Sequence, residues 1–151
     1  MGQVIAEEDS RAGMLSGDRF EHHWQSIAEQ LDYIPHIWAT WWTKEALREG
    51  VLNGRFQCWA AGDESRITVV AFSQIADYPA NRIFQVFLAF GQGIDEVAPV
   101  LEAVWEQFAA KSGCSVGEVT GRPGWGPRLR KLGFRQQSCT FTRSVSNLRI
   151  N

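Results

Sequence analysis

The sequence predicts an α+β fold in which a mixed, mainly antiparallel sheet is flanked by helices. Apolar residues recur at helical spacing through the N-terminal third of the chain. Three strand-like runs separated by turn residues follow, which is typical of an antiparallel meander. A long amphipathic helix and a short apolar run come next, and a helix between two strands usually returns the chain to a parallel neighbour. The expected element order is ααα-βββ-α-β-α-β.

The region 18–54 is expected to be helical, because its apolar residues recur every three or four positions. Residues 1–17 show no sustained period and are expected to form a first strand around Gln3–Ala6 or an arm. The expected helices cover residues 19–31 behind an Asp18 cap, a segment from Pro35 that carries Trp38 and Trp41, and a segment from a Thr43 cap to Gly50 or Gly54.

The region 55–145 is expected to hold the sheet. Its runs are rich in β-branched and aromatic residues and are separated by Gly62-Asp63-Glu64-Ser65 and Tyr78-Pro79-Ala80-Asn81, both typical of turns. The predicted strands are Phe56–Ala61, Ile67–Ala76, Arg82–Phe90, a buried Cys114–Val119 and a final Gln137–Val145, with helices over residues 97–108 and 126–132.

The composition is that of an ordinary globular protein, and 151 residues suffice for one domain, 1–151. A net charge of -2 gives no overall field that attracts nucleic acid or an anionic membrane. No apolar run is long enough to span a bilayer, and the N-terminus lacks the basic and then apolar order of a signal peptide. Cys58, Cys114 and Cys139 are widely spaced, which favours reduced thiols in a cytosolic protein.

Two segments resemble signatures of the GNAT (Gcn5-related N-acetyltransferase) family. They are Lys111-Ser112-Gly113-Cys114 before the fourth predicted strand and Leu129-Arg130-Lys131-Leu132-Gly133-Phe134 before the last one. The order of elements over residues 55–145 resembles that family as well. A third segment, Gly121-Arg122-Pro123-Gly124-Trp125, is similar to small GNAT-like proteins of tailed bacteriophages. That resemblance implies a component of the virion core or of virion assembly, located in the cytoplasm of the infected bacterium or in the virion, and not secreted.

The GNAT resemblance implies an acetyl-CoA loop after the third strand of the meander, where successive backbone N–H groups hold the pyrophosphate. The matching residues are Gly91, Gln92 and Gly93. The family's Arg or Gln three residues before the first glycine is replaced by Leu88. The other interpretation is that Gly91 and Gly93 merely form a turn and a helix start.

Candidate catalytic residues are few. Glu118 on the fourth predicted strand could act as a base or could pair with Arg122 as a structural carboxylate. Cys114 could act as an acid or could be a buried, inert thiol. The tyrosine that the family often carries near the last helix is missing, since the two tyrosines of this chain are Tyr33 and Tyr78.

A basic cluster surrounds the predicted short helix, and it is a candidate partner-binding surface. It suits an acidic protein surface or the phosphates of CoA better than nucleic acid, although such charges on a short helix often simply face solvent. Adjacent histidines on one helix diverge, so we expect no metal site at His22 and His23. The cluster consists of Arg122, Trp125, Arg128, Arg130 and Lys131.

Two functions therefore remain. The reduced loop, the missing tyrosine and the seven tryptophans favour a phage protein that binds other structural or assembly proteins, without acetyl transfer and without a cofactor, and that is compatible with an oligomer. The alternative is an acetyl-CoA-dependent N-acetyltransferase with a reduced cofactor loop.

Overall fold

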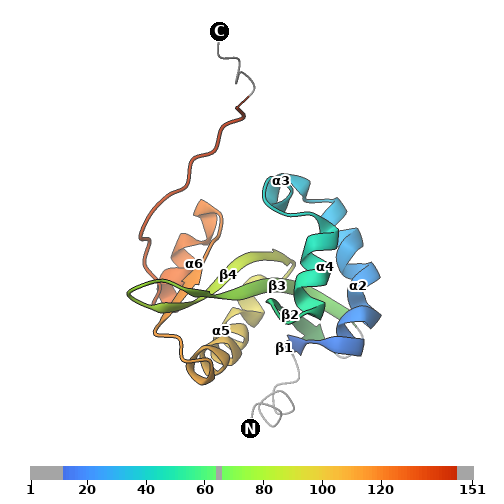
Figure 1. Ribbon diagram of the computed structural model, residues 1–151, viewed down its shortest axis with the longest axis horizontal. Helices are drawn as coiled ribbons and strands as arrows, with labels where there is room; N and C mark the ends of the chain where they lie inside the picture. The colour runs from blue at the N-terminus through green and yellow to red at the C-terminus, as the bar shows by residue number, and fades with distance from the viewer. Residues whose placement is uncertain (1–11, 64–65, 146–151) are drawn as a thin grey trace.

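A computed structural model describes residues 12–63 and 66–145, and it contains a five-stranded mixed sheet in the order β1-β2-β3-β4-β5 (Figure 1). One core cluster joins three helices to one face of the sheet, and a second joins the long helix to the other face. The predicted α+β class is confirmed. The strands are β1 (Ala12–Leu15), β2 (Phe56–Asp63), β3 (Arg66–Asp77), β4 (Arg82–Gly91) and β5 (Val116–Val119), and the helices are α2 (Gly17–Asp32), α3 (Pro35–Trp38), α4 (Lys44–Leu52), α5 (Ile94–Lys111) and α6 (Gly126–Lys131), with a 3-10 turn at Pro123–Trp125.

The first strand and the first helix differ from their predictions. The strand expected around Gln3–Ala6 lies outside the described residues, and β1 forms nearer to α2, where it pairs antiparallel with β2. Ser16 is the N-cap of α2, so the prediction of Asp18 as the cap is wrong. Asp18 lies instead in the first turn, where its negative charge suits the helix dipole.

The second and third helices largely follow the sequence. α3 begins at Pro35 as predicted but ends at Trp38, whose buried indole N–H donates to the Leu31 carbonyl at 2.9 Å. Trp41 therefore lies beyond the helix and is exposed, contrary to its predicted place in it. The Thr43 cap of α4 is confirmed, because the Thr43 hydroxyl accepts the Ala46 N–H at 3.0 Å.

β2, β3 and β4 form the predicted antiparallel meander, and one irregularity in it shapes the site. Val86 pairs with Ser73 and Leu88 pairs with Phe72, so Phe87 is an extra residue on β4. Because strand side chains alternate between faces, one inserted residue moves the following side chains to the opposite face. Val86 accordingly packs with α5, whereas Leu88 packs in the cluster of α2, α3 and α4.

The C-terminal part differs most from the prediction. β4 and β5 are parallel, as the crossover helix implied, but β5 begins at Val116 rather than Cys114 and is largely exposed rather than buried. The final strand predicted over Gln137–Val145 is wrong, because these residues are extended, exposed and unpaired within the described part of the chain. The segment runs away from the sheet (Figure 1). β5 is the edge strand of the sheet, and within residues 12–63 and 66–145 its outer edge has no strand partner.

Candidate functional site

The parallel pair of β4 and β5 opens halfway along β4. The pairs cover Ile83–Val86 and Val116–Val119, and the Thr120 N–H donates to the Val86 carbonyl at 2.9 Å as the last bond between them. Beyond it, Phe87–Gly91 face no strand on this side within the described residues. Their outward backbone N–H and C=O groups are available to a ligand or to water. We call this stretch the β4–β5 opening.

The loop Gly91-Gln92-Gly93 lies at the end of the opening and leads into α5. Gly91 has a φ of 129°, and a Cβ there would lie 2.0 Å from the Thr68 carbonyl oxygen, so this position requires glycine. Gly93 caps α5 with a φ of 73°, and a Cβ there would approach nothing closer than the Glu96 carboxylate at 4.0 Å. The Gln92 N–H already donates to the Thr68 carbonyl at 2.9 Å. Open space therefore lies over Gly93 and not over Gly91.

The N-terminus of α5 combines hydrogen-bond donors with acidic side chains. The N–H groups of Gly93, Ile94 and Asp95 have no backbone acceptor within the described residues. Free amides and the helix dipole favour an anion at this end of α5. The carboxylates of Asp95 and Glu96 in the same turn oppose an anion. The affinity of the site for phosphate therefore depends on how these two charges are balanced.

Arg128 balances one of these charges. Its guanidinium forms an ion pair with Asp95, and this hydrogen bond lowers the pKa of the Asp95 carboxyl, with a further small contribution from Lys131. The pair ties α6 to the first turn of α5. The structure thus brings part of the predicted basic cluster to the predicted cofactor loop, and it engages Arg128 within the chain.

The other members of the cluster have different surroundings. The Trp125 ring lies against Gly121, where a Cβ would be 2.7 Å from the ring, so this glycine makes room for the indole. Arg130 folds back along α6, with its guanidinium 3.2 Å from a Cβ placed at Gly126. Arg122 and Lys131 are exposed. Partner binding by these residues stays a prediction.

Glu118 belongs to a polar chain across three strands. The Gln74 amide donates to Gln85 at 3.2 Å, and the Gln85 amide donates to Glu118 at 2.9 Å. Glu118 is exposed and pairs with Gln85 one residue before the last parallel pair. No ion pair between Glu118 and Arg122 occurs among the described residues. The carboxylate is therefore oriented by an amide next to the opening, and its other oxygen is accessible.

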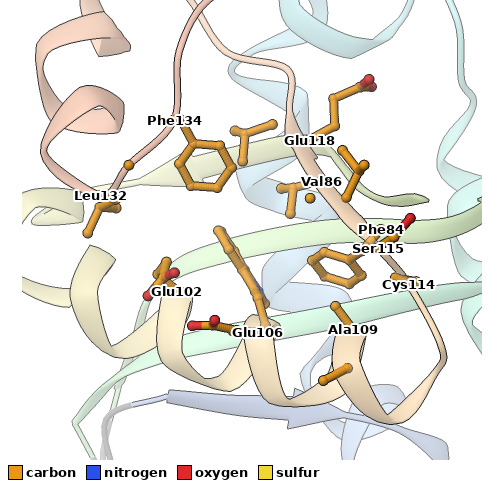
Figure 2. Close-up of a pocket in the computed structure, with 16 residues that line it drawn as sticks. Phe84, Val86, Glu102, Glu106, Ala109, Cys114, Ser115, Glu118, Leu132 and Phe134 are labelled. Atoms are coloured by element: carbon orange, nitrogen blue, oxygen red, sulfur yellow. The ribbon is translucent and has the colours of Figure 1, made fainter. Parts of the chain in front are cut away.

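Cys114 lies before the first β4–β5 pair, away from the opening, although it lines the same cavity as Glu118. It precedes β5 and lines a cavity of about 370 Å³ between the second half of α5, β5 and residues 132–134 (Figure 2). Burial raises the pKa of its thiol, so the group stays protonated. Figure 2 shows Glu118 pointing away from the Glu102 and Glu106 carboxylates of α5. Of the two catalytic candidates, Glu118 alone is placed beside the opening.

Sequence reasoning missed Gln85 and Asp95 as parts of the site. The alternation of apolar Phe84 and Val86 around Gln85 indicates that Gln85 faces away from α5, but not which strand it meets. Leu88 is buried in the helical cluster, so its side chain does not replace the polar residue that the family places before the loop.

The described residues contain no group of three or more His, Cys, Asp or Glu side chains placed to hold a metal ion. His22 and His23 contact each other edge to face, with ring centroids 5.0 Å apart. None of the described helices has the length and apolar character needed to cross a bilayer.

Comparisons with solved structures show the fold. A probable acetyltransferase has a TM-score of 0.67 at 14% identity over 91% of this chain and 99% of its own. An aminoglycoside acetyltransferase from an uncultured soil metagenomic sample has a TM-score of 0.67 at 16% identity over 89% of this chain and 97% of its own. AAC(6')-Iy, in complex with the bisubstrate analogue CoA-S-monomethyl-acetylneamine, has a TM-score of 0.62 at 16% identity over 88% of this chain and 96% of its own.

Neither a protein-family model nor a curated protein matches the sequence. No finding links the chain to bacteriophage proteins. At these low identities the similarity shows the fold alone. The activity has to be inferred from the residues of the site. The protein therefore has the GNAT fold, which is the fold of the family that its sequence resembles over residues 55–145.

Proposed function

We propose that the protein is an acetyl-CoA-dependent N-acetyltransferase with a reduced cofactor loop. The observation behind this proposal is the β4–β5 opening, which leads directly into the glycine loop and the free amides of α5. The acetyltransferases of similar fold add support. The phage assembly role, expected from the segment 121–125, the reduced loop, the missing tyrosine and the tryptophans, has gained no support.

The chemistry of acetyl-CoA fits the residues of the opening. Its pyrophosphate is an anion suited to the free N–H groups of Gly93, Ile94 and Asp95. Its pantetheine arm contains two secondary amides, and an extended amide chain can pair with an exposed strand edge such as Phe87–Gly91. The space over Gly93 admits a ligand close to the backbone.

Two departures from the family pattern reduce the expected affinity. The polar residue at the start of the loop is missing, because Leu88 is part of the core. The carboxylate of Glu96 remains next to the phosphate position, while Arg128 neutralises that of Asp95. We therefore expect the Kd for acetyl-CoA to lie in the micromolar range rather than the nanomolar range. A Kd of about 1 μM corresponds to a binding free energy of about −8 kcal/mol.

Glu118 is the residue best placed for proton transfer. When bound, acetyl-CoA supplies an activated acetyl thioester. Gln85 holds one carboxylate oxygen of Glu118, and the other is free to attract a protonated amine and to accept its proton. Tyr33 and Tyr78 are exposed at the end of α2 and in the β3–β4 turn, so neither serves the opening. Protonation of the departing thiolate is left to solvent.

Calorimetry with acetyl-CoA and CoA tests the cofactor site. Gly93→Val should abolish binding, because the side chain would enter the open space over the loop. Gly113→Val is the matched control, since Gly113 has a similar φ of 77° at the other end of α5 and no atom within 4 Å of its Cβ position. No binding to the unchanged protein, or equal binding by both variants, would exclude the proposed site.

Transfer is tested by thiol release from acetyl-CoA with a panel of primary amines. Glu118→Gln should lower kcat by about 100-fold with little change in acetyl-CoA affinity. Glu45→Gln, an exposed carboxylate of α4, is the control and should leave kcat unchanged. Equal turnover by both variants would show that Glu118 takes no part in proton transfer.

A further inference from the structure

Residues from four neighbouring strands form a row on one face of the sheet. Residues that pair across strands point to the same face. Phe56 packs in the core cluster of α2, α3 and α4, so the row lies on the face that these helices cover. The row consists of Phe56 on β2, Gln74 on β3, Gln85 on β4 and Glu118 on β5, which pair in this order. Glu118 therefore ends the row on the side of the β4–β5 opening, and an apolar ring ends it on the other side.

Aromatic rings border the row near Phe56. Phe87, the extra residue of β4, lies two positions after Gln85 and is partly buried against the helical cluster. Trp42 packs on Phe56 and on Phe87, with ring centroids 5.2 Å and 4.9 Å apart. The backbone N–H of Trp42 donates to the Trp38 carbonyl at 3.0 Å, which fixes the turn between α3 and α4. We call the rings of Trp42, Phe56 and Phe87 the aromatic wall.

The aromatic wall and the other end of the row differ in charge. Residues 33–43, which carry Trp42, contain no Asp, Glu, Lys or Arg. Glu118 is an exposed carboxylate that accepts the Gln85 amide at 2.9 Å. A ligand that fits both ends has one cationic group for Glu118 and an apolar body for the wall. A second cationic group would find no carboxylate along residues 33–43, and it would lose part of its hydration against the rings.

The spacing of the sheet sets the size of this ligand. Neighbouring strands lie about 4.8 Å apart and alternate residues of one strand about 6.6 Å apart, so the Cα atoms of Glu118 and Phe87 are separated by about 8 Å. Both residues lie on the helical face, because Glu118 pairs with Gln85 and Phe87 packs on the helical cluster. A linker of about two methylene groups between an ammonium group and a ring matches this separation.

We infer that the acceptor of the proposed transfer is a primary amine on a short aromatic arm, with its ammonium at Glu118 and its ring against the aromatic wall. This inference rests on the proposed function, and it adds the chemical class of the acceptor and Trp42 as a residue that selects it. Glu118 takes one proton from the ammonium, and the nitrogen then bonds to the acetyl carbon as the C–S bond breaks. The second amine proton passes to solvent, and solvent protonates the thiolate.

NMR titration of the full chain with free amines tests the ligand class without turnover. 2-Phenylethylamine should bind at least about 10-fold more tightly than propylamine, because the two amines carry the same charge and differ in the ring that the wall covers. Spermidine should bind no more tightly than propylamine, since it adds charge without a ring. A Kd for 2-phenylethylamine equal to that for propylamine, or tightest binding of spermidine, would overturn the inference.

Trp42→Ala tests the part that the aromatic wall plays in this preference. The change should weaken binding of 2-phenylethylamine about 10-fold and leave that of propylamine within about twofold. The ratio of the two Kd values does not depend on how much of the variant is folded, so a loss of stability leaves the test valid. Trp41→Ala is the matched control, since Trp41 is 57% exposed on the same turn and makes none of these ring contacts among the described residues. An unchanged ratio in Trp42→Ala, or an equal change in both variants, would overturn the role of the wall.

Thiol release from acetyl-CoA separates this inference from the proposed function. The kcat/KM for 2-phenylethylamine should exceed that for propylamine about 10-fold, and Trp42→Ala should remove the difference through KM with little change in kcat. Equal kcat/KM values for the two amines would support the transferase function and overturn the inference. An intact binding preference without thiol release from any amine would overturn the transferase function and support the ligand class.

Discussion

The two edges of β4 show how one strand serves two purposes. Its edge with β3 is paired from Arg82 to Gly91, with one extra residue at Phe87, and buries apolar side chains on both faces. Its edge with β5 is paired over Ile83–Val86 and then opens. The closed edge joins neighbours along the chain and stabilises the fold. The open edge joins distant segments and leaves backbone groups free for a ligand.

The largest effect is expected where the closed edge meets the loop. Gly91→Val should reduce the free energy of unfolding by about 3 kcal/mol or more, because a Cβ would clash with the Thr68 backbone at a positive φ. Gly113→Val should lose only about 1–2 kcal/mol from backbone strain. Urea unfolding measures both. Equal losses would mean that the clash at Gly91 is relieved without cost.

A buried hydrogen bond gives the next largest effect. Ser73 is fully buried on β3, accepts the Trp59 indole N–H at 2.8 Å and donates to Gln57 at 2.9 Å. Ser73→Ala should reduce the free energy of unfolding by about 1–3 kcal/mol, because it leaves the indole N–H unpaired.

A comparison of two tryptophans sharpens this prediction. Trp105→Phe should reduce the free energy of unfolding less than Trp59→Phe, because the Trp105 N–H has no acceptor to lose among the described residues. A larger loss of stability for Trp105→Phe than for Trp59→Phe, measured by thermal unfolding, would contradict this account of the closed edge.

The open edge should respond in binding rather than stability. Arg128→Gln should weaken CoA binding about two- to fivefold, because the Asp95 carboxylate then faces the phosphate at the helix N-terminus without its partner. Arg130→Gln is the control, since Arg130 folds back along α6. Equal affinity of both variants for CoA, measured by calorimetry, would show that the Arg128–Asp95 pair does not affect cofactor binding.

The smallest expected effect is on pH dependence. The Arg128 hydrogen bond lowers the pKa of Asp95 below its ordinary value of 3.8 in the folded state. The resulting stability is present above pH 3.8 and is lost as the pH falls through the folded pKa. The unchanged protein and Arg128→Gln should therefore converge in urea midpoint as the pH falls below 3.8. A difference that persists in acid would assign the effect to packing of Arg128.

Local signals predicted most of the helices and the meander. The Thr43 cap, the start of α3 at Pro35 and the turn between β3 and β4 depend on neighbouring residues, and the structure confirms them. Of the turn predicted over residues 62–65, residues 62 and 63 belong to β2 and the other two lie outside the described residues. Gly91 and Gly93 were assigned to a loop between β4 and α5 for the same reason. The sequence did not predict the extra residue at Phe87, because the bulge exists only relative to the register of β3.

The sequence by itself determined the α+β class, the meander, the long helix and the glycine loop, since each follows from propensities and periods within a short window. Only the tertiary structure decided that β4 and β5 separate after Val86, that Arg128 meets Asp95, and that Gln85 holds Glu118. These contacts join residues about thirty positions apart. The residues of 137–145 have the period of a strand, but a strand also needs a partner edge, and the packing of the whole chain decides whether one is supplied.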